Sequence, residues 1–207
     1  MNRNLVILLH GVGSNGANLA SLAEAWRHAL PNTEFAAPDA PFPFAHGPGR
    51  QWFSVNGVTE ANRPERVAAA RVAFDKTIGD IIAAHGLTDQ PERIALVGFS
   101  QGSIMALDAV ASGRWPVAVV VAFSGRLASP QPLLPAAGTR VLLIHGDADP
   151  IMPVGESVRA ANVLKRLGVD VTSRILAGAG HSISSEGATI AGTFLAGIFE
   201  STGKGDA

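Results

Sequence analysis

Hydrophobic positions along this chain form two kinds of pattern that alternate from end to end. Short continuous apolar runs, such as LVILL at residues 5–9, are typical of strands buried on both faces of a sheet. Longer stretches carry apolar residues at helical spacing, as Val67, Phe74 and Ile78 do. The predicted strands are 5–9, 35–37, 94–97, 117–123, 140–144 and 170–176, and the predicted helices are 17–30, 64–85, 101–111, 155–167 and 185–200.

Alternating strands and helices predict a parallel sheet with helices on both faces. We therefore expect one three-layer α/β domain over residues 1–200, with about six mostly parallel strands, and a flexible tail over 201–207. Residues 38–49 are too rich in Pro and Gly to predict regular structure there. No internal repeat or linker divides the sequence.

Composition excludes several classes of protein. A hydrophobic fraction of 47% with only 16% charged residues excludes a disordered chain. The net charge of −1 gives no field that attracts nucleic acid. The longest apolar run, at 115–123, has nine residues, whereas a membrane-spanning helix needs about 20. With no Cys, the chain has neither a disulfide framework nor a thiol nucleophile. We expect a cytoplasmic globular protein that does not bind nucleic acid.

Residues 98–102 read Gly-Phe-Ser-Gln-Gly and match the pattern G-x-S-x-G. They lie between a predicted strand and a predicted helix, where this pattern forms a sharp turn that exposes the serine above the sheet. Small residues two positions before and after the serine avoid clashes in that strained turn. Ser100 is therefore the candidate nucleophile.

A serine nucleophile needs a base, and two histidines follow Ser100. His145 ends a predicted strand and is expected to be structural. His181 lies in the loop GAGHS at 178–182, which can turn toward Ser100, so His181 is the candidate base. Asp147 and Asp149 compete for the acid that orients this base. We favour Asp149, because Pro150 and apolar residues follow it and would shield its carboxylate.

The loop at 10–16 reads His-Gly-Val-Gly-Ser-Asn-Gly and follows the first predicted strand. Glycines allow its backbone to aim an N–H at the reacting carbonyl, so the backbone N–H groups of Val12 and Gln101 are the candidate oxyanion hole. Dinucleotide binding is the competing interpretation, since Gly11, Gly13 and Gly16 match G-x-G-x-x-G. A dinucleotide site would leave the serine motif without a role. The second predicted strand also lacks the acidic residue that such a site uses to bind the ribose.

The motifs LLHGVG at 8–13, GFSQG at 98–102, HGxxD at 145–149 and GH at 180–181 resemble the phospholipase/carboxylesterase family of α/β-hydrolases. That family includes acyl-protein thioesterases and small bacterial carboxylesterases. The resemblance extends from residue 5 to about 199 and includes the aromatic segment RQWFS at 50–54. It implies an α/β-hydrolase fold, a triad of Ser100, Asp149 and His181, and an oxyanion hole at Val12 and Gln101. Dienelactone hydrolases, which are close to this family, use a cysteine that this chain lacks.

The expected activity is hydrolysis of short- to medium-chain carboxylic esters through an acyl-enzyme, without a metal or organic cofactor. Only 16 residues, 124–139, separate two predicted strands where a cap domain is commonly inserted, so we expect an open site without a cap. Its apolar wall is predicted to consist of Phe42, Phe44, Trp52, Phe53, Leu133, Leu134, Ile151 and Met152.

Other activities and assemblies stay open at this point. Acyl-thioester hydrolysis and lysophospholipase-type activity would use the same triad. A non-catalytic, hydrolase-like binding protein would use the pocket as a receptor. The partner expected in each enzymatic case is a small ester or thioester, and a homodimer is an open alternative.

Overall fold

A computed structural model describes residues 3–203 and centres on a six-stranded sheet. The strand order is β2-β1-β5-β6-β7-β8, and every neighbouring pair is parallel. This confirms the predicted sheet of about six mostly parallel strands. The strands are β1 (Asn4–Leu9), β2 (Thr33–Ala36), β5 (Ile94–Phe99), β6 (Val119–Phe123), β7 (Arg140–Gly146) and β8 (Asp170–Leu176).

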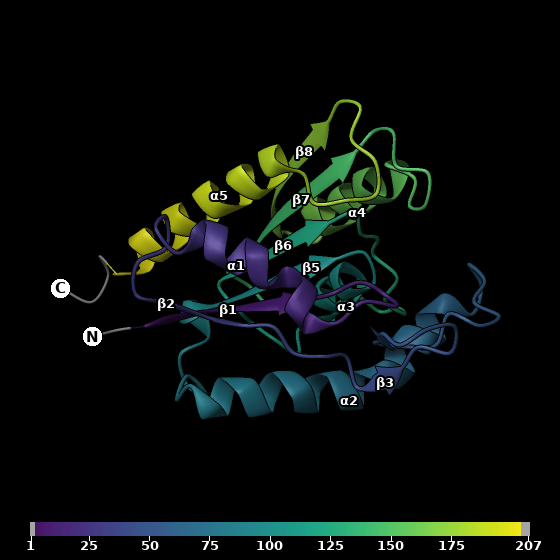
Figure 1. Cartoon of the computed structure of the whole chain (residues 1–207), viewed down its shortest axis with the longest axis horizontal. Helices are drawn as coiled ribbons and strands as arrows, with labels where there is room; N and C mark the ends of the chain where they lie inside the picture. Colours follow the sequence, from purple (N-terminus) through teal and green to yellow (C-terminus); the bar gives the residue numbers. More distant parts are fainter. Residues whose placement is uncertain (1–2, 204–207) are drawn as a thin grey trace.

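Helices cover both faces of the sheet and complete the three layers (Figure 1). Helices α1 and α5 pack on one face, and α2, α3 and α4 pack on the other. The bounds are α1 (Ala20–Trp26), α2 (Arg63–Ala84), α3 (Gln101–Ala111), α4 (Gly155–Arg166) and α5 (Ser185–Gly203).

The first strand shows why the apolar runs are continuous. Leu5, Ile7 and Leu9 point into the core beneath α2 and α3, while Val6 and Leu8 point into the core beneath α1 and α5. All five side chains are fully buried. Successive strand residues face opposite sides of a sheet, so a strand between two helical layers must be apolar at every position.

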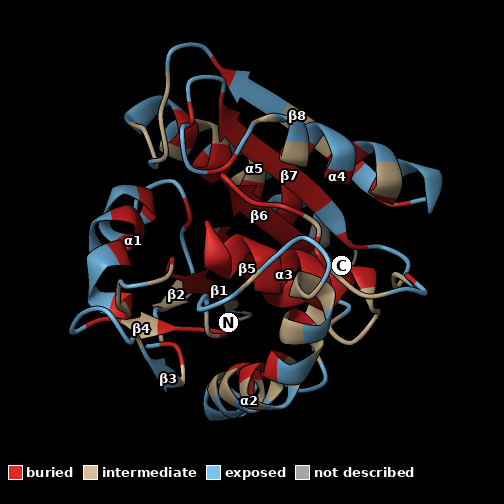
Figure 2. Ribbon diagram, turned by 90° about the vertical axis from the view of Figure 1, so that its right-hand side faces the viewer, coloured by how far each residue is buried: buried red, intermediate tan, exposed pale blue. Residues whose placement is uncertain are grey.

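Helix α3 lies at the centre of the molecule and is buried along its whole length (Figure 2). It follows β5 directly, with only Ser100 between the two elements. Ser100 therefore lies between a buried strand and a buried helix.

Several element boundaries differ from the predicted ones. The helix predicted at 17–30 is shorter, because a 3₁₀ turn occupies Gly16–Leu19 and α1 ends at Trp26. Residues 38–49, predicted to lack regular structure, contribute β3 (Phe42–Pro43), which pairs with β4 (Arg50–Gln51) in a two-stranded antiparallel ladder. Helix α5 continues to Gly203, and the rest of the predicted tail, 204–207, lies outside the described residues.

Residues 124–139 connect β6 to β7 without a helix or a strand. The predicted absence of a cap domain at this position is confirmed. Among residues 3–203, no helix combines the length and the apolar character that crossing a membrane requires.

Candidate active site

The turn at Ser100 has the strained geometry that its motif predicts. Ser100 has φ 53° and ψ −112°, outside the usual regions for a residue with a side chain. Its N–H donates to the Phe123 carbonyl on the neighbouring strand at 2.9 Å. A Cβ at Gly98 would lie 2.4 Å from the Ser103 nitrogen, and one at Gly102 would lie 2.0 Å from the Leu9 carbonyl oxygen. Only glycine fits at both positions, so the pattern G-x-S-x-G follows directly from packing.

His181 and Asp149 meet Ser100 at the carboxyl ends of the strands. The Ser100 Oγ lies 3.0 Å from His181 Nε2, and His181 Nδ1 lies 2.7 Å from Asp149 Oδ2. The Asp149 side chain is fully buried, whereas 17% of the His181 side chain is exposed. The structure thus brings together the three residues that the sequence predicts as nucleophile, base and acid.

Asp149 is held as a carboxylate by a dense set of donors. Its Oδ1 accepts the N–H groups of Ile151 and Met152 at 2.9 and 2.8 Å. Burial by itself raises the pKa of Asp149, but the hydrogen bonds from Met152, His181, Ile151 and Ser124 outweigh it and lower the pKa to about 2. A charged carboxylate therefore faces His181 at neutral pH.

The competing carboxylate, Asp147, is exposed and does not contact His181. Its Oδ1 accepts the Gly178 N–H at 2.7 Å. Next to it, the Ala148 N–H donates to the Ala179 carbonyl at 3.1 Å. Asp147 and Ala148 therefore hold the loop that carries His181, while Asp149 contacts the imidazole.

His145 has the structural place that its position predicts. Its side chain is fully buried, with Nε2 2.8 Å from the Met152 carbonyl and Nδ1 2.6 Å from the Ser157 hydroxyl. A carbonyl can only accept, so Nε2 carries the proton of the bond to Met152. The ring fixes the segment that follows Asp149 and leaves the base position to His181.

The Gly-rich loop after β1 is braced by the Pro-rich segment. The Gly13 N–H donates to the Arg50 carbonyl at 2.8 Å, and the Trp52 indole N–H donates to the His10 carbonyl at 2.9 Å. His10 Nε2 accepts the Ala40 N–H at 2.9 Å, and burial lowers the pKa of His10, which keeps this imidazole neutral. These contacts fix the backbone on either side of Val12.

Two backbone donors in this region are free. Within residues 3–203, neither the Val12 nor the Gln101 N–H has a hydrogen-bond acceptor. The Gln101 side chain points the other way: its Oε1 accepts the Trp52 N–H and its Nε2 donates to the Phe53 carbonyl, both at 2.8 Å. Gln101 thereby couples the turn at Ser100 to residues 52 and 53.

Part of the predicted apolar wall lies beside the site. Phe42 and Phe53 line a hollow of about 360 Å³ together with residues of α2. Phe44 lies against Gly13 in the Gly-rich loop. Ile151 is 68% exposed and Met152 is buried, and both follow Asp149 directly.

Three predictions for this wall are wrong. Trp52 is only 1% exposed and packs edge-on against Phe74, so it supports the site from within the core. The N–H of Leu134 donates to the carbonyl of Ala111, the last residue of α3. Leu133 and Leu134 therefore lie at the end of α3 opposite Ser100, because a helix of this length separates its two ends by about 16 Å.

Three residues near the site had no predicted role: Ser124, Phe99 and Arg126. Ser124, at φ 46°, hydrogen-bonds Asp149. The Phe99 ring lies 4.9 Å from the His181 ring, measured between centroids. Arg126 pairs with Glu60 at 2.6 Å and links the segment before α2 to the region of Met152. The positive φ of Ser124 has no signature in a single sequence.

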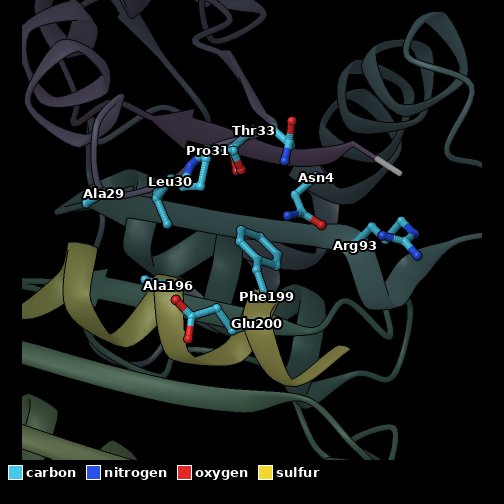
Figure 3. A pocket seen from close by; sticks show the side chains of 10 residues that line it. Asn4, Ala29, Leu30, Pro31, Thr33, Arg93, Ala196, Phe199 and Glu200 are labelled. Carbon is cyan, nitrogen blue, oxygen red and sulfur yellow. The ribbon is translucent and has the colours of Figure 1, made fainter. Parts of the chain in front are cut away.

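A separate pocket lies at the amino ends of the strands (Figure 3). Its lining includes Asn4, Thr33 and Arg93 and side chains of α5, such as Phe199. None of the predicted site residues lines it, and the amino ends are the edge of the sheet opposite to Ser100. The candidate site is therefore the cluster around Ser100, at the carboxyl ends, where open α/β sheets bind their ligands.

Comparisons with known proteins agree with this geometry. Residues 1–198 match the model of the family described as Phospholipase/Carboxylesterase. Esterase YpfH of Escherichia coli (strain K12) is 34% identical over 183 residues, which cover 88% of this chain and 78% of that protein. Acyl-protein thioesterase 1 of Neurospora crassa is 30% identical over 199 residues, which cover 87% of this chain and 81% of that protein.

Solved structures show the same relationship. The crystal structure of esterase PE8 has 36% sequence identity to this chain and a TM-score of 0.84, and the match covers 95% of this chain and 93% of that one. The predicted fold and the predicted class of enzyme, a carboxylic ester hydrolase, are both confirmed at this level. The chain belongs to the phospholipase/carboxylesterase family of α/β-hydrolases.

Proposed function

We propose that the chain is a serine carboxylesterase that hydrolyses short- to medium-chain carboxylic esters through Ser100, His181 and Asp149. The observation that carries the proposal is the unbroken chain of contacts from Ser100 Oγ to His181 and on to Asp149. Nucleophile, base and orienting acid within hydrogen-bond distance of one another are the arrangement that activates a serine.

Acylation begins with proton transfer from the Ser100 hydroxyl to His181 Nε2. Asp149 accepts the Nδ1–H of His181, which keeps Nε2 free as the acceptor and stabilises the imidazolium that forms. Ser100 Oγ attacks the ester carbonyl, and the carbonyl oxygen gains negative charge. The free N–H groups of Val12 and Gln101 are the donors that we assign to this oxyanion.

Collapse of the tetrahedral intermediate releases the alcohol. The imidazolium of His181 gives its proton to the leaving oxygen as the bond from carbon to that oxygen breaks. Water then enters, His181 takes its proton, and the hydroxide attacks the acyl-enzyme at the same carbonyl. Ser100 leaves with the proton from His181, and the carboxylic acid is released. Ser100 supplies the proton that His181 passes on in acylation, and the attacking water supplies the one that His181 passes on in deacylation.

The acyl group is assigned to the hollow at Phe42 and Phe53. Most of the surface of this hollow is apolar, although Gln51, Ser54 and Arg66 also line it. The Gln101 side chain fixes the Phe53 backbone directly beside the turn at Ser100. Its volume of about 360 Å³ suits short and medium acyl chains. The absence of a helix in residues 124–139 leaves the site without a cap at that position.

Labelling with a fluorophosphonate probe tests the proposal. Wild type and Ser21→Ala, an exposed serine on α1, should both be labelled, and Ser100→Ala should not. Hydrolysis of p-nitrophenyl esters from acetyl to palmitoyl should depend on Ser100 in the same way. An unlabelled wild type would favour a binding protein that uses the pocket as a receptor.

Acyl-thioester hydrolysis is the second candidate function. It is supported by the 30% identity to a protein named acyl-protein thioesterase 1. Ester and thioester substrates with the same butyryl group separate the two activities, because they form the same acyl-enzyme and differ only in the leaving group. A lysophospholipase-type activity would instead appear as turnover of acyl-glycerophosphate esters. The homodimer and the cytoplasmic location stay predictions.

A further inference from the structure

A second concavity adjoins the site on the opposite face of the sheet from the Phe42 hollow. It has a volume of about 530 Å³ and runs between α1 and the loop that leads into α5, with His181 as one wall. Helix α1 lies beside α5 (Figure 1), and the Trp26 indole N–H donates to the Ala188 carbonyl at 2.8 Å, which holds the two sides of the concavity together. We call this concavity the α1 groove.

The floor of the α1 groove is apolar. Leu19, Leu22 and Ile183 contribute aliphatic side chains, and Phe99 contributes an aromatic ring that also contacts His181. Leu19 and Leu22 are buried, so the helix presents them as a fixed surface. A ligand in this groove would therefore contact hydrocarbon groups along the floor.

The rim of the α1 groove is polar and uncharged. Ser14 and Asn18 contact each other, with the Asn18 amide donating to the Ser14 hydroxyl at 2.9 Å. Ser21, Ser182 and Ser185 are exposed, and their hydroxyls have no protein partner within residues 3–203. None of the described residues that line the groove is Asp, Glu, Lys or Arg. The rim therefore offers several donors and acceptors and no positive charge.

The direction of the proton transfer assigns the two concavities to the two halves of an ester. The leaving oxygen must face His181 Nε2 to receive its proton. His181 is a wall of the α1 groove, whereas the Phe42 hollow is bounded by α2 on the other face of the sheet. With the acyl group on the side of α2, the alcohol half extends into the α1 groove.

We propose that the α1 groove binds the alcohol half of the substrate and selects a neutral polyhydroxy alcohol, such as a glycerol or sugar moiety. This inference rests on the proposed esterase function. Polyols present C–H groups to an apolar floor and hydroxyls to a polar rim, as this groove requires. Without Lys or Arg in its lining, the groove offers a phosphate only neutral donors, which offset less of its desolvation than charged ones do.

During deacylation the same groove can bind an alcohol that accepts the acyl group. By microscopic reversibility, an alcohol that fits the leaving-group site can replace water as the acceptor of the acyl group. Its hydroxyl gives a proton to His181, its oxygen bonds to the acyl carbon, and Ser100 Oγ departs with that proton. Glycerol should therefore capture the butyryl-enzyme better than 1-propanol does at equal concentration.

The test compares glycerol monobutyrate with propyl butyrate, which share the acyl group and the three-carbon alcohol. The variant Ser21→Leu replaces a rim hydroxyl with an apolar side chain. The neighbouring Ala20→Leu adds the same side chain at an exposed position outside the groove and is the matched control. We measure kcat/KM for both esters in all three proteins, because the ratio between variants cancels the intrinsic reactivity of the two alcohols.

We expect Ser21→Leu to lower kcat/KM for glycerol monobutyrate about five-fold, the value of one hydrogen bond, and not to lower it for propyl butyrate. Ala20→Leu should leave both values unchanged. Equal effects of the two variants, faster turnover of propyl butyrate by wild type, or a preference for butyryl-glycerol phosphate would each overturn the inference and leave the esterase function standing. Hydrolysis of both esters by Ser100→Ala would instead overturn the proposed function itself.

Discussion

Replacing Asp149 by Asn changes the proton arrangement of the site without changing its size. Asp149 Oδ1 accepts two backbone N–H groups, and Oδ2 accepts the His181 Nδ1–H. An Asn oxygen can keep the two backbone donors, but its NH₂ group then faces His181. The imidazole must present Nδ1 as an acceptor and carry its proton on Nε2, so Nε2 cannot take the proton of Ser100.

Two magnitudes follow for Asp149→Asn. The wrong tautomer should lower kcat by a factor of order 10⁴, as the equivalent change does in a serine protease triad. The pKa of Asp149 lies at about 2 against an ordinary value of 3.8, a difference worth about 2–3 kcal/mol. Because the folded pKa is depressed, this stabilisation is present above about pH 4 and is lost as the pH falls toward 2.

The assay pairs Asp149→Asn with Asp147→Asn as its control. Asp147→Asn keeps an oxygen for the Gly178 N–H, so it should cost about five-fold in kcat at most, the difference between a charged and a neutral acceptor. Urea unfolding at pH 7 and near pH 3 measures the stability, and the deficit of Asp149→Asn should shrink at the lower pH. If Asp149→Asn turned over like wild type, or Asp147→Asn lost more activity, the acid would not be Asp149.

Three further predictions test the triad, the open site and the core. Ser100→Ala and His181→Ala should each lower kcat by at least about 10³-fold, and the double variant should be hardly worse; losses that multiply would show that the two residues act independently. The value of kcat/KM should rise about four-fold per buried CH₂, the equivalent of about 0.8 kcal/mol, through short and medium acyl chains and then fall; a steady rise to palmitoyl esters, or a jump above the micelle concentration, would contradict a site without a cap. Asp108→Asn should lower the free energy of unfolding by about 3–5 kcal/mol in urea, because the fully buried Asp108 carboxylate pairs with Arg71 and Arg114; a loss under about 1 kcal/mol would mean that these ion pairs contribute little.

The sheet and the three central residues could be predicted because each depends on local patterns. Strands such as β1 must be apolar at every position when helices cover both faces. The strained turn at Ser100 needs glycine at positions 98 and 102, since any Cβ there would overlap backbone atoms. Parallel strands bring their carboxyl ends to one edge, so Asp149 and His181, which follow later strands, had to lie near Ser100.

The bracing of the Gly-rich loop could not be predicted in the same way. Gly13 and Arg50 are joined by a backbone hydrogen bond across residues rich in Pro and Gly, and a ladder as short as β3 with β4 has no periodicity to detect. Hydrophobicity also failed to separate a pocket wall from the core: Trp52 and Leu134 are both apolar, yet one is buried beneath the loop and the other lies at the far end of α3.

Backbone strain in this site is concentrated at the ends of two neighbouring central strands. Ser100 follows β5 at φ 53° and Ser124 follows β6 at φ 46°. A residue in a sparsely populated conformation costs about 1–3 kcal/mol and persists only where its surroundings hold it. Here the Ser100 N–H is bound to β6 and the Ser124 N–H to β7, so each strained residue is fixed by the next strand. The same two turns present one hydroxyl to His181 and the other to Asp149, so the buried sheet holds both ends of the proposed triad in place before a substrate binds.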